Sequence, residues 1–156
     1  MLNHKSPEYI NVNPNAGASY TFNYFIEKFG TPTSIDEALQ KVLGHGYSYY
    51  YNSKYSNKVA IDRIKNKQGV NCTDSAQVFY LIGKHLGYET QFIQVQCKSG
   101  GHIRLRLKHP TKTSNKWIYR DHACVLSGKQ GVTGNWCSTG KVIAYNPSWI
   151  FTDLQQ

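Results

Sequence analysis

The spacing of hydrophobic residues changes once along the chain, near residue 88. Before that point, apolar residues recur every three or four positions, which is the spacing of one face of a helix. The pattern predicts helices over residues 19–30, 34–44 and 58–66, and a capping box of Ser34 and Glu37 begins the second of them. The first half of the chain is therefore predicted to be helical.

A further predicted helix, Cys72–Leu86, is apolar on nearly every side. A helix with this pattern is buried on all its faces. Gly83 would let a neighbouring element approach closely, and Gly87 fits the position just after a helix end. The polar sequence NCTD, residues 71–74, leaves this buried helix with one end open to solvent, which is the geometry of a site.

After residue 88, apolar and polar residues alternate, as in a strand with one buried face. Strands are predicted over residues 88–97 and 101–109, joined by a short hairpin turn, then over 116–126, with a last strand and a turn within 142–151. Helices followed by a mostly antiparallel sheet indicate the α+β class, with the helix that begins at Cys72 packed on the sheet.

The chain of 156 residues fits a single domain. Residues 1–18 hold two prolines and several turn formers, so we expect a linker or loosely docked segment there and one domain over residues 19–156. No apolar run approaches the ~20 residues of a membrane span, and no secretory signal is visible at the amino terminus. We expect a soluble protein with no membrane partner.

Charge narrows the choice of partners. With 18 Lys and Arg against 9 Asp and Glu, the chain has a formal net charge of +9 at pH 7. A positive field of this size attracts anionic polymers and surfaces. The basic residues are spread along the chain without a dense tract, which disfavours a nucleic-acid partner.

Four cysteines, Cys72, Cys97, Cys124 and Cys137, could form two disulfides in three connectivities, a zinc site, or neither. No C-x-x-C pair and no clustered Cys/His spacing is present, which disfavours a metal site. A domain of this size also folds without covalent bridges. We therefore expect four reduced thiols and no bound metal.

Cys72 stands where a helix begins, and the positive end of the helix dipole favours a thiolate there. Free cysteines are more often structural, so the chemical interpretation needs a base and an orienting group. His102 opens the second predicted strand and Asp121 lies in the third, and neighbouring antiparallel strands can bring the two together. His109 and His122 are rival bases, although His122 would point to the opposite face of a strand from Asp121.

The residues around these positions match a known superfamily. The segment 69–95, GVNCTDSAQVFYLIGKHLGYETQFIQV, resembles a transglutaminase-type core, as do GHIRLRL and WIYRDHA further on. With CKSGGHIRLRLKH, WIYRDHACV, NWCS and YNPSW included, the chain from residue 69 to about 150 more particularly resembles the pseudomurein endoisopeptidases. These are lytic cysteine peptidases of viruses that infect pseudomurein-walled methanogenic archaea.

The resemblance implies a transglutaminase-like or papain-like core with Cys72 as nucleophile, His102 as general base and then acid, and Asp121 as the orienting carboxylate. The bond cut in that family is the isopeptide between alanine and the ε-amino group of lysine in the wall crosslink. The oxyanion would lie against the backbone N–H of Cys72, with Asn71 as the candidate for a second donor.

The same resemblance implies pseudomurein, an acidic polymer, as the partner. We expect a monomer that acts on the archaeal cell wall after being made in the host cytoplasm by a virus or provirus. No cofactor is expected to be required, although the resemblance suggests stimulation by a divalent cation such as calcium.

Two rival functions use the same residues differently. A transglutaminase would pass the acyl group to an amine instead of water, and a non-catalytic module would bind the wall through its tyrosine-rich, basic surface. The phase of the second strand raises a question, because alternation sends Arg104 and Arg106 to the same face as His102, and a buried face would reject arginines. We expect His102 to lie at the rim of the sheet, with a bulge as the alternative.

The tryptophans are expected in the core; they are Trp117, Trp136 and Trp149.

Overall fold

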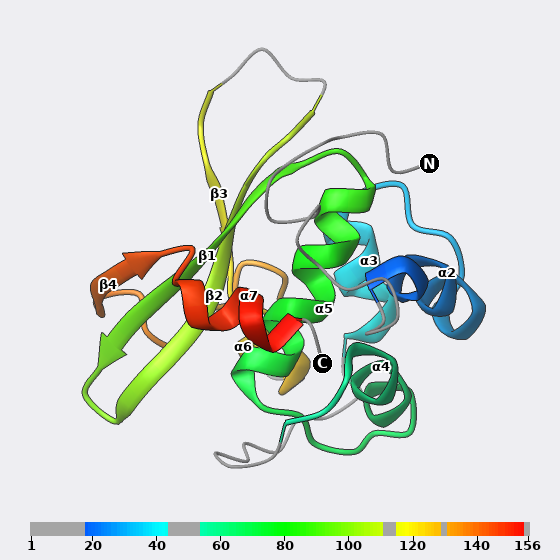
Figure 1. The fold of residues 1–156 in the computed structure, drawn as a ribbon, viewed down its shortest axis with the longest axis horizontal. Helices are drawn as coiled ribbons and strands as arrows, with labels where there is room; N and C mark the ends of the chain where they lie inside the picture. Colours follow the sequence, from blue (N-terminus) through cyan, green and yellow to red (C-terminus); the bar gives the residue numbers. More distant parts are fainter. Residues whose placement is uncertain (1–17, 44–53, 111–114, 129–130, 155–156) are drawn as a thin grey trace.

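The computed structural model describes residues 18–43, 54–110, 115–128 and 131–154 (Figure 1). The predicted linker, residues 1–18, lies outside these ranges except for Ala18, as does Gly44, the predicted end of the second helix. The helices are α2 (Ala18–Phe29), α3 (Ile35–Val42), α4 (Asn57–Lys65), α5 (Cys72–His85), α6 (His122–Leu126) and α7 (Ser148–Leu154), and the strands are β1 (Glu89–Cys97), β2 (Gly100–Lys108), β3 (Ile118–Arg120) and β4 (Lys141–Tyr145).

The strands form one antiparallel sheet in the order β3-β2-β1-β4. Strands β1 and β2 make a hairpin whose register runs without interruption from Glu89 opposite Lys108 to Cys97 opposite Gly100. The pairing of β1 with β4 shifts between Gln94 and Val95. The α+β class expected from the sequence is confirmed.

Helix α5 is the centre of the fold. In Figure 1 it stands between the sheet and the group of α2, α3 and α4, and it contacts both sides. Every residue from Cys72 to Lys84 is buried, as the all-round apolar pattern predicts. A Cβ at Gly83 would lie 2.9 Å from Thr90 Oγ1 and 3.1 Å from Leu107 Cδ2, so the missing side chain lets α5 approach the sheet. Gly87 follows the helix with φ +89°, a left-handed conformation that ends it.

The predicted starts of the shorter helices are also confirmed. The Ser34 side chain accepts a hydrogen bond from the Glu37 amide (3.0 Å) and caps α3. The Glu37 carboxylate accepts from the Thr33 amide (3.0 Å) in place of the Ser34 amide that a full capping box would use. Ser56 caps α4 through the Val59 amide.

Two predictions in the second half are wrong. The third strand was expected over residues 116–126, but β3 ends at Arg120 because Asp121 accepts a hydrogen bond from the Cys124 amide (3.2 Å) and begins α6. The predicted turn after the last strand is the helix α7, whose Ile150 and Leu154 are both buried. Their spacing of four residues is a helical signal in a segment that begins just after Pro147.

The expectation of four reduced thiols is also wrong. Cys97 and Cys137 form a disulfide with their Cα atoms 5.9 Å apart, while Cys72 and Cys124 are buried and not part of a disulfide. The bridge joins the end of β1 to the loop before β4, across 40 residues of sequence. Cysteine spacing alone could not reveal this contact, because it depends on how the loop returns to the sheet.

Candidate active site

A cavity of about 200 Å³ lies at the amino end of α5, where the helix meets β1 and β2. It contains the polar helix start that the sequence marks as a site. Residues from three parts of the fold line it, and they are Asn71, Cys72, Thr73, Gln94, Gly101, His102, Ile103 and Trp149.

Cys72 is the first residue of α5, and its side chain is 6% exposed. The preceding residue, Asn71, has an extended backbone and accepts a hydrogen bond from the Asp74 amide through Oδ1 (2.7 Å), which caps the helix. The sulfur therefore lies at the positive end of the helix dipole, beside first-turn N–H groups that have no partner within the helix.

His102 makes two side-chain hydrogen bonds, one with Asp121 and one with Cys72. Its Nε2 lies 2.8 Å from Asp121 Oδ2. Burial lowers the pKa of His102, but the hydrogen bonds and charges of Asp121 and Cys72 outweigh this and raise the pKa to about 9. At neutral pH the imidazole is therefore protonated, and it interacts with the Cys72 and Asp121 side chains.

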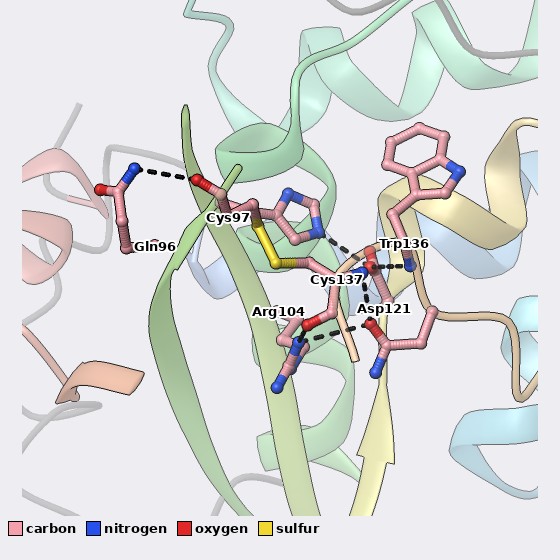
Figure 2. The surroundings of a disulfide bond; sticks show 8 residues. Gln96, Cys97, Arg104, Asp121, Trp136 and Cys137 are labelled. Atoms are coloured by element: carbon pink, nitrogen blue, oxygen red, sulfur yellow. Dashed lines mark hydrogen bonds and ion pairs between the residues drawn. A yellow bond between two sulfur atoms is a disulfide. The ribbon is translucent and has the colours of Figure 1, made fainter. Parts of the chain in front are cut away.

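Asp121 is 1% exposed and is held by three hydrogen bonds. Oδ1 accepts from the Cys124 amide of α6, and Oδ2 accepts from His102 and from the Trp136 amide (3.1 Å). Figure 2 shows Asp121 and Trp136 on the side of the sheet where the disulfide lies. The structure thus brings together the three predicted side chains, in the arrangement that nucleophilic catalysis uses.

The phase question is answered by the sheet register. The uninterrupted β1–β2 pairing leaves no bulge beside His102, which is the third residue of β2 and follows the exposed Gly101. Arg104 shares its face and is 6% exposed, so the expectation that a buried face rejects an arginine is wrong. The Arg104 Nη1 donates to the Cys137 carbonyl oxygen (2.6 Å) in the interior, while the buried Nε of the same guanidinium has no hydrogen-bond partner among the described residues.

The rival histidines are not placed near Cys72. His122 is fully buried and stacks on Phe79 with the ring centroids 4.1 Å apart, and burial lowers its pKa to about 3. His109 packs against Tyr88 (5.3 Å between ring centroids) and lines a separate cavity. Of the histidines in the described ranges, His102 is the one that lines the cavity with Cys72.

Asp74 is an acidic residue in the first turn of α5, where its negative charge would oppose a thiolate at Cys72. In the structure Asp74 is 1% exposed, and its Oδ1 accepts a hydrogen bond from the Tyr55 amide (3.2 Å). The carboxylate therefore ties the segment before α4 to the first turn of α5.

Two residues at the site were misassigned from the sequence. Trp149 is 41% exposed and lines the cavity, and its Nε1 donates to Gln94 Oε1 (3.2 Å). Trp136 is 45% exposed, with its ring centroid 6.0 Å from that of His102. Both tryptophans were expected in the core, and this is wrong. The motifs NWCS and YNPSW, which contain them, were the available signal.

No group of three or more His, Cys, Asp or Glu residues in the part of the chain that the structure describes could hold a metal ion. None of the described helices is both long and apolar enough to cross a membrane.

Comparison with known proteins gives consistent matches. The family model described as pseudomurein endo-isopeptidase Pei matches residues 15–142. The chain is similar to pseudomurein endoisopeptidase PeiW of Methanothermobacter phage psiM100, with 39% identity over 90 residues, 53% of this chain and 31% of the relative. It is also similar to a pseudomurein endoisopeptidase of Methanobacterium phage psiM2, with 28% identity over 104 residues, 60% of this chain and 34% of the relative. The matches cover about a third of the length of these curated relatives.

Proposed function

The chain belongs to the pseudomurein endo-isopeptidase family, and we propose that it is a cysteine peptidase that hydrolyses the isopeptide bond between alanine and the ε-amino group of lysine in pseudomurein. We further propose that its core is transglutaminase-like, with the nucleophile at the start of a buried helix. The net charge of +9 supports an acidic wall polymer as substrate. We propose that it acts on the archaeal cell wall.

In the first half of the proposed reaction, the Cys72 thiolate attacks the alanine carbonyl carbon. The new C–S bond forms while the carbonyl π electrons move to oxygen, and the resulting oxyanion is bound by the backbone N–H of Cys72 with Asn71 as the candidate second donor. The intermediate collapses by breaking the C–N bond, and the His102 imidazolium gives its proton to the departing lysine nitrogen. The products are a free lysine amine and a Cys72 thioester.

In the second half, neutral His102 takes a proton from water as the water attacks the thioester carbonyl. Collapse of this intermediate breaks the C–S bond and releases the alanine carboxyl group. Cys72 leaves as a thiolate beside the reprotonated His102, so the starting ion pair is restored. Asp121 keeps the imidazole aligned in both halves without changing its own protonation. No step requires a cofactor, and stimulation by calcium is tested by adding and chelating the cation.

The observation that carries the proposal is that His102 lines the same cavity as Cys72, interacts with the Cys72 side chain, and lies 2.8 Å from Asp121 through Nε2. The test compares lysis of pseudomurein-walled cells, and release of free amine from a wall peptide, by the wild type and by Cys72→Ala. Cys124→Ala is the matched control, because Cys124 is the other buried cysteine outside the disulfide and the substitution keeps the backbone amide that binds Asp121.

We expect Cys72→Ala to lose hydrolysis and Cys124→Ala to keep it, with both variants folded by circular dichroism. Ammonia release with crosslink formation in place of amine release would indicate an acyl transferase. Full lysis by Cys72→Ala would refute the peptidase and favour a wall-binding module.

A further inference from the structure

Arg104 is a buried cation two residues beyond His102 on β2. Its Nη1 donates to the Cys137 carbonyl oxygen (2.6 Å) and to Asn135 Oδ1 (3.3 Å). Burying a guanidinium is costly, so hydrogen bonds to it are strong when they form away from water. Both acceptors lie within residues 134–137, a segment that we call the 134–137 turn.

The 134–137 turn reaches the proposed orienting carboxylate. Between the two Arg104 acceptors stands Trp136, whose backbone N–H donates to Asp121 Oδ2 (3.1 Å). The same oxygen lies 2.8 Å from His102 Nε2. Inside the turn, Asn135 Oδ1 accepts from the Cys137 amide (3.0 Å), which fixes its backbone. Figure 2 shows this chain of contacts from Arg104 through Cys137 and Trp136 to Asp121.

A covalent bond anchors the other side of the 134–137 turn. The disulfide joins Cys137 to Cys97 at the end of β1, the strand that pairs with β2. A Cβ at Gly140 would lie 2.3 Å from Cys137 Sγ and 3.2 Å from the Gln96 carbonyl oxygen, so residue 140 has no room for a side chain beside the bridge. The bridge and the loop that follows it are therefore closely packed against β1.

We propose that Arg104 and the Cys97–Cys137 disulfide are positioning elements, which hold the 134–137 turn so that the Trp136 amide keeps the Asp121 carboxylate aimed at His102. The inference rests on the proposed function, because it gives these groups a role in the same reaction. In the contacts above, neither Arg104 nor the disulfide touches the Cys72 sulfur or the His102 imidazole. Both act on the reaction through Asp121.

The need for such an anchor follows from the position of Asp121. It lies after the three-residue edge strand β3 and is otherwise held by the Cys124 amide, which binds Oδ1. Without the Trp136 amide, the carboxylate can rotate and Oδ2 loses its alignment with His102. Strand β2 carries both His102 and Arg104. It therefore positions the proposed base, and through Arg104 it also positions the 134–137 turn that holds Asp121.

The experiment compares Arg104→Met with Arg106→Met, two substitutions at neighbouring positions on one face of β2. Arg106 contacts Gln91 and the rings of Trp117 and Tyr145, and none of these residues lines the cavity with Cys72. A second variant, Cys97→Ala with Cys137→Ala, removes the disulfide and leaves Arg104 in place. Arg104→Lys restores a charged donor.

Two readouts separate positioning from general stability. One is kcat and KM for a wall isopeptide, and the other is the pH midpoint of the His102 ring followed by NMR. The groups facing His102 are Cys72 from α5 and Asp121 at the start of α6, with Arg104 next on the same face of β2. A variant in which the Asp121 carboxylate loses its position should have a lower His102 midpoint. A variant that only loosens the protein surface should keep the wild-type midpoint.

We expect Arg104→Met and the double cysteine variant each to lower kcat about tenfold or more with KM within about twofold, since each weakens a hydrogen bond to a charged group. Their His102 midpoints should fall by at least about one unit. Arg106→Met should match the wild type, and Arg104→Lys should recover part of the loss.

The proposal is overturned if the His102 midpoint stays at the wild-type value in both Arg104→Met and the folded double cysteine variant. A midpoint that falls in those variants, in a protein whose wild type cleaves no wall peptide, would keep the positioning role and reject the proposed function. The two ideas can therefore fail separately.

Discussion

Replacement of Asp121 by Asn tests whether the three side chains at the cavity act as one unit. The substitution keeps the size of the side chain but removes its charge, and it places an amide where Oδ2 now accepts from His102 and from the Trp136 amide. Asp121 is 1% exposed, so water does not replace the lost acceptor. His102 remains buried without the partner that offsets its burial.

The size of the effect follows from the pKa of His102, which burial lowers and which Asp121 and Cys72 together raise to about 9 from an ordinary 6.5. Without the carboxylate, and with Cys72 still raising it, we expect a pKa near 7, a fall of roughly two units, and each unit is worth about 1.4 kcal/mol. The protonated imidazole is then stabilised by about 3 kcal/mol less. This corresponds to a hydrolysis rate roughly a hundredfold lower if the lost charge acts fully in the transition state.

The raised pKa of His102 also determines how the stability of the fold changes with pH. A pKa raised in the folded state gives stability that is present below pH 6.5 and lost as the pH rises through about 9. In Asp121→Asn the ion pair with Cys72 should instead disappear on passing neutral pH, so the alkaline limb of the hydrolysis profile should move down by about two units.

The assay combines the NMR midpoint of His102, isopeptide hydrolysis from pH 5 to 10, and thermal unfolding. Asp36→Asn is the control, because Asp36 is another acid whose side chain holds a partner, Arg120, at 2.7 Å, and it does not line the cavity. A His102 midpoint that stays near 9 in Asp121→Asn, with hydrolysis within threefold of the wild type, would refute the reasoning.

Three further predictions use other residues. Near pH 6, iodoacetamide should alkylate Cys72 much faster than Cys124, because protonated His102 favours the Cys72 thiolate while burial raises the pKa of Cys124 to about 11; equal labelling by mass spectrometry would contradict this. Trp149→Ala should raise KM for a wall peptide roughly tenfold, by loss of about 1–2 kcal/mol of apolar contact in the cavity, while the alkylation rate of Cys72 stays unchanged; a change in kcat alone would argue against a binding role. His122→Leu should resist acid better than the wild type, because burial lowers the pKa of His122 to about 3 and the unfolded chain therefore binds a proton that the folded chain does not as the pH falls from 6.5 to 3. Acid unfolding followed by circular dichroism should show a lower midpoint for this variant, and an identical midpoint would reject the explanation.

The sequence is most informative where a local pattern alone determines the structure. The all-round apolar run after Cys72 predicts a buried helix, and the polar NCTD sequence predicts its open end. Alternation predicts the two strands of the hairpin that carries His102. Asp121 is predicted in the right place for the wrong reason, because the same carboxylate that binds His102 also caps α6 and ends the strand. A pattern of alternating residues does not reveal that one carboxylate makes both of these contacts.

The supports of the site were beyond prediction because each depends on contacts between distant segments. The sequence gives no reason for Cys97 to meet Cys137, or for the Trp136 amide to meet Asp121, until the loop before β4 is folded back on the hairpin. The predicted linker, residues 1–18, and the expected monomer stay predictions.

Arg104 shows how an apparent conflict in a sequence can point to a function. Alternation put this arginine on the face of His102, and a buried arginine looked like an error in the strand's phase. The structure keeps both residues on that face, and Arg104 Nη1 donates to the Cys137 carbonyl oxygen, while the buried Nε has no hydrogen-bond partner within the described part of the chain. A cation that costs free energy to bury is retained where a neutral residue would pack more easily. Its acceptors flank the amide that binds Asp121, so the cost is explained if the arginine holds the carboxylate in line with the imidazole.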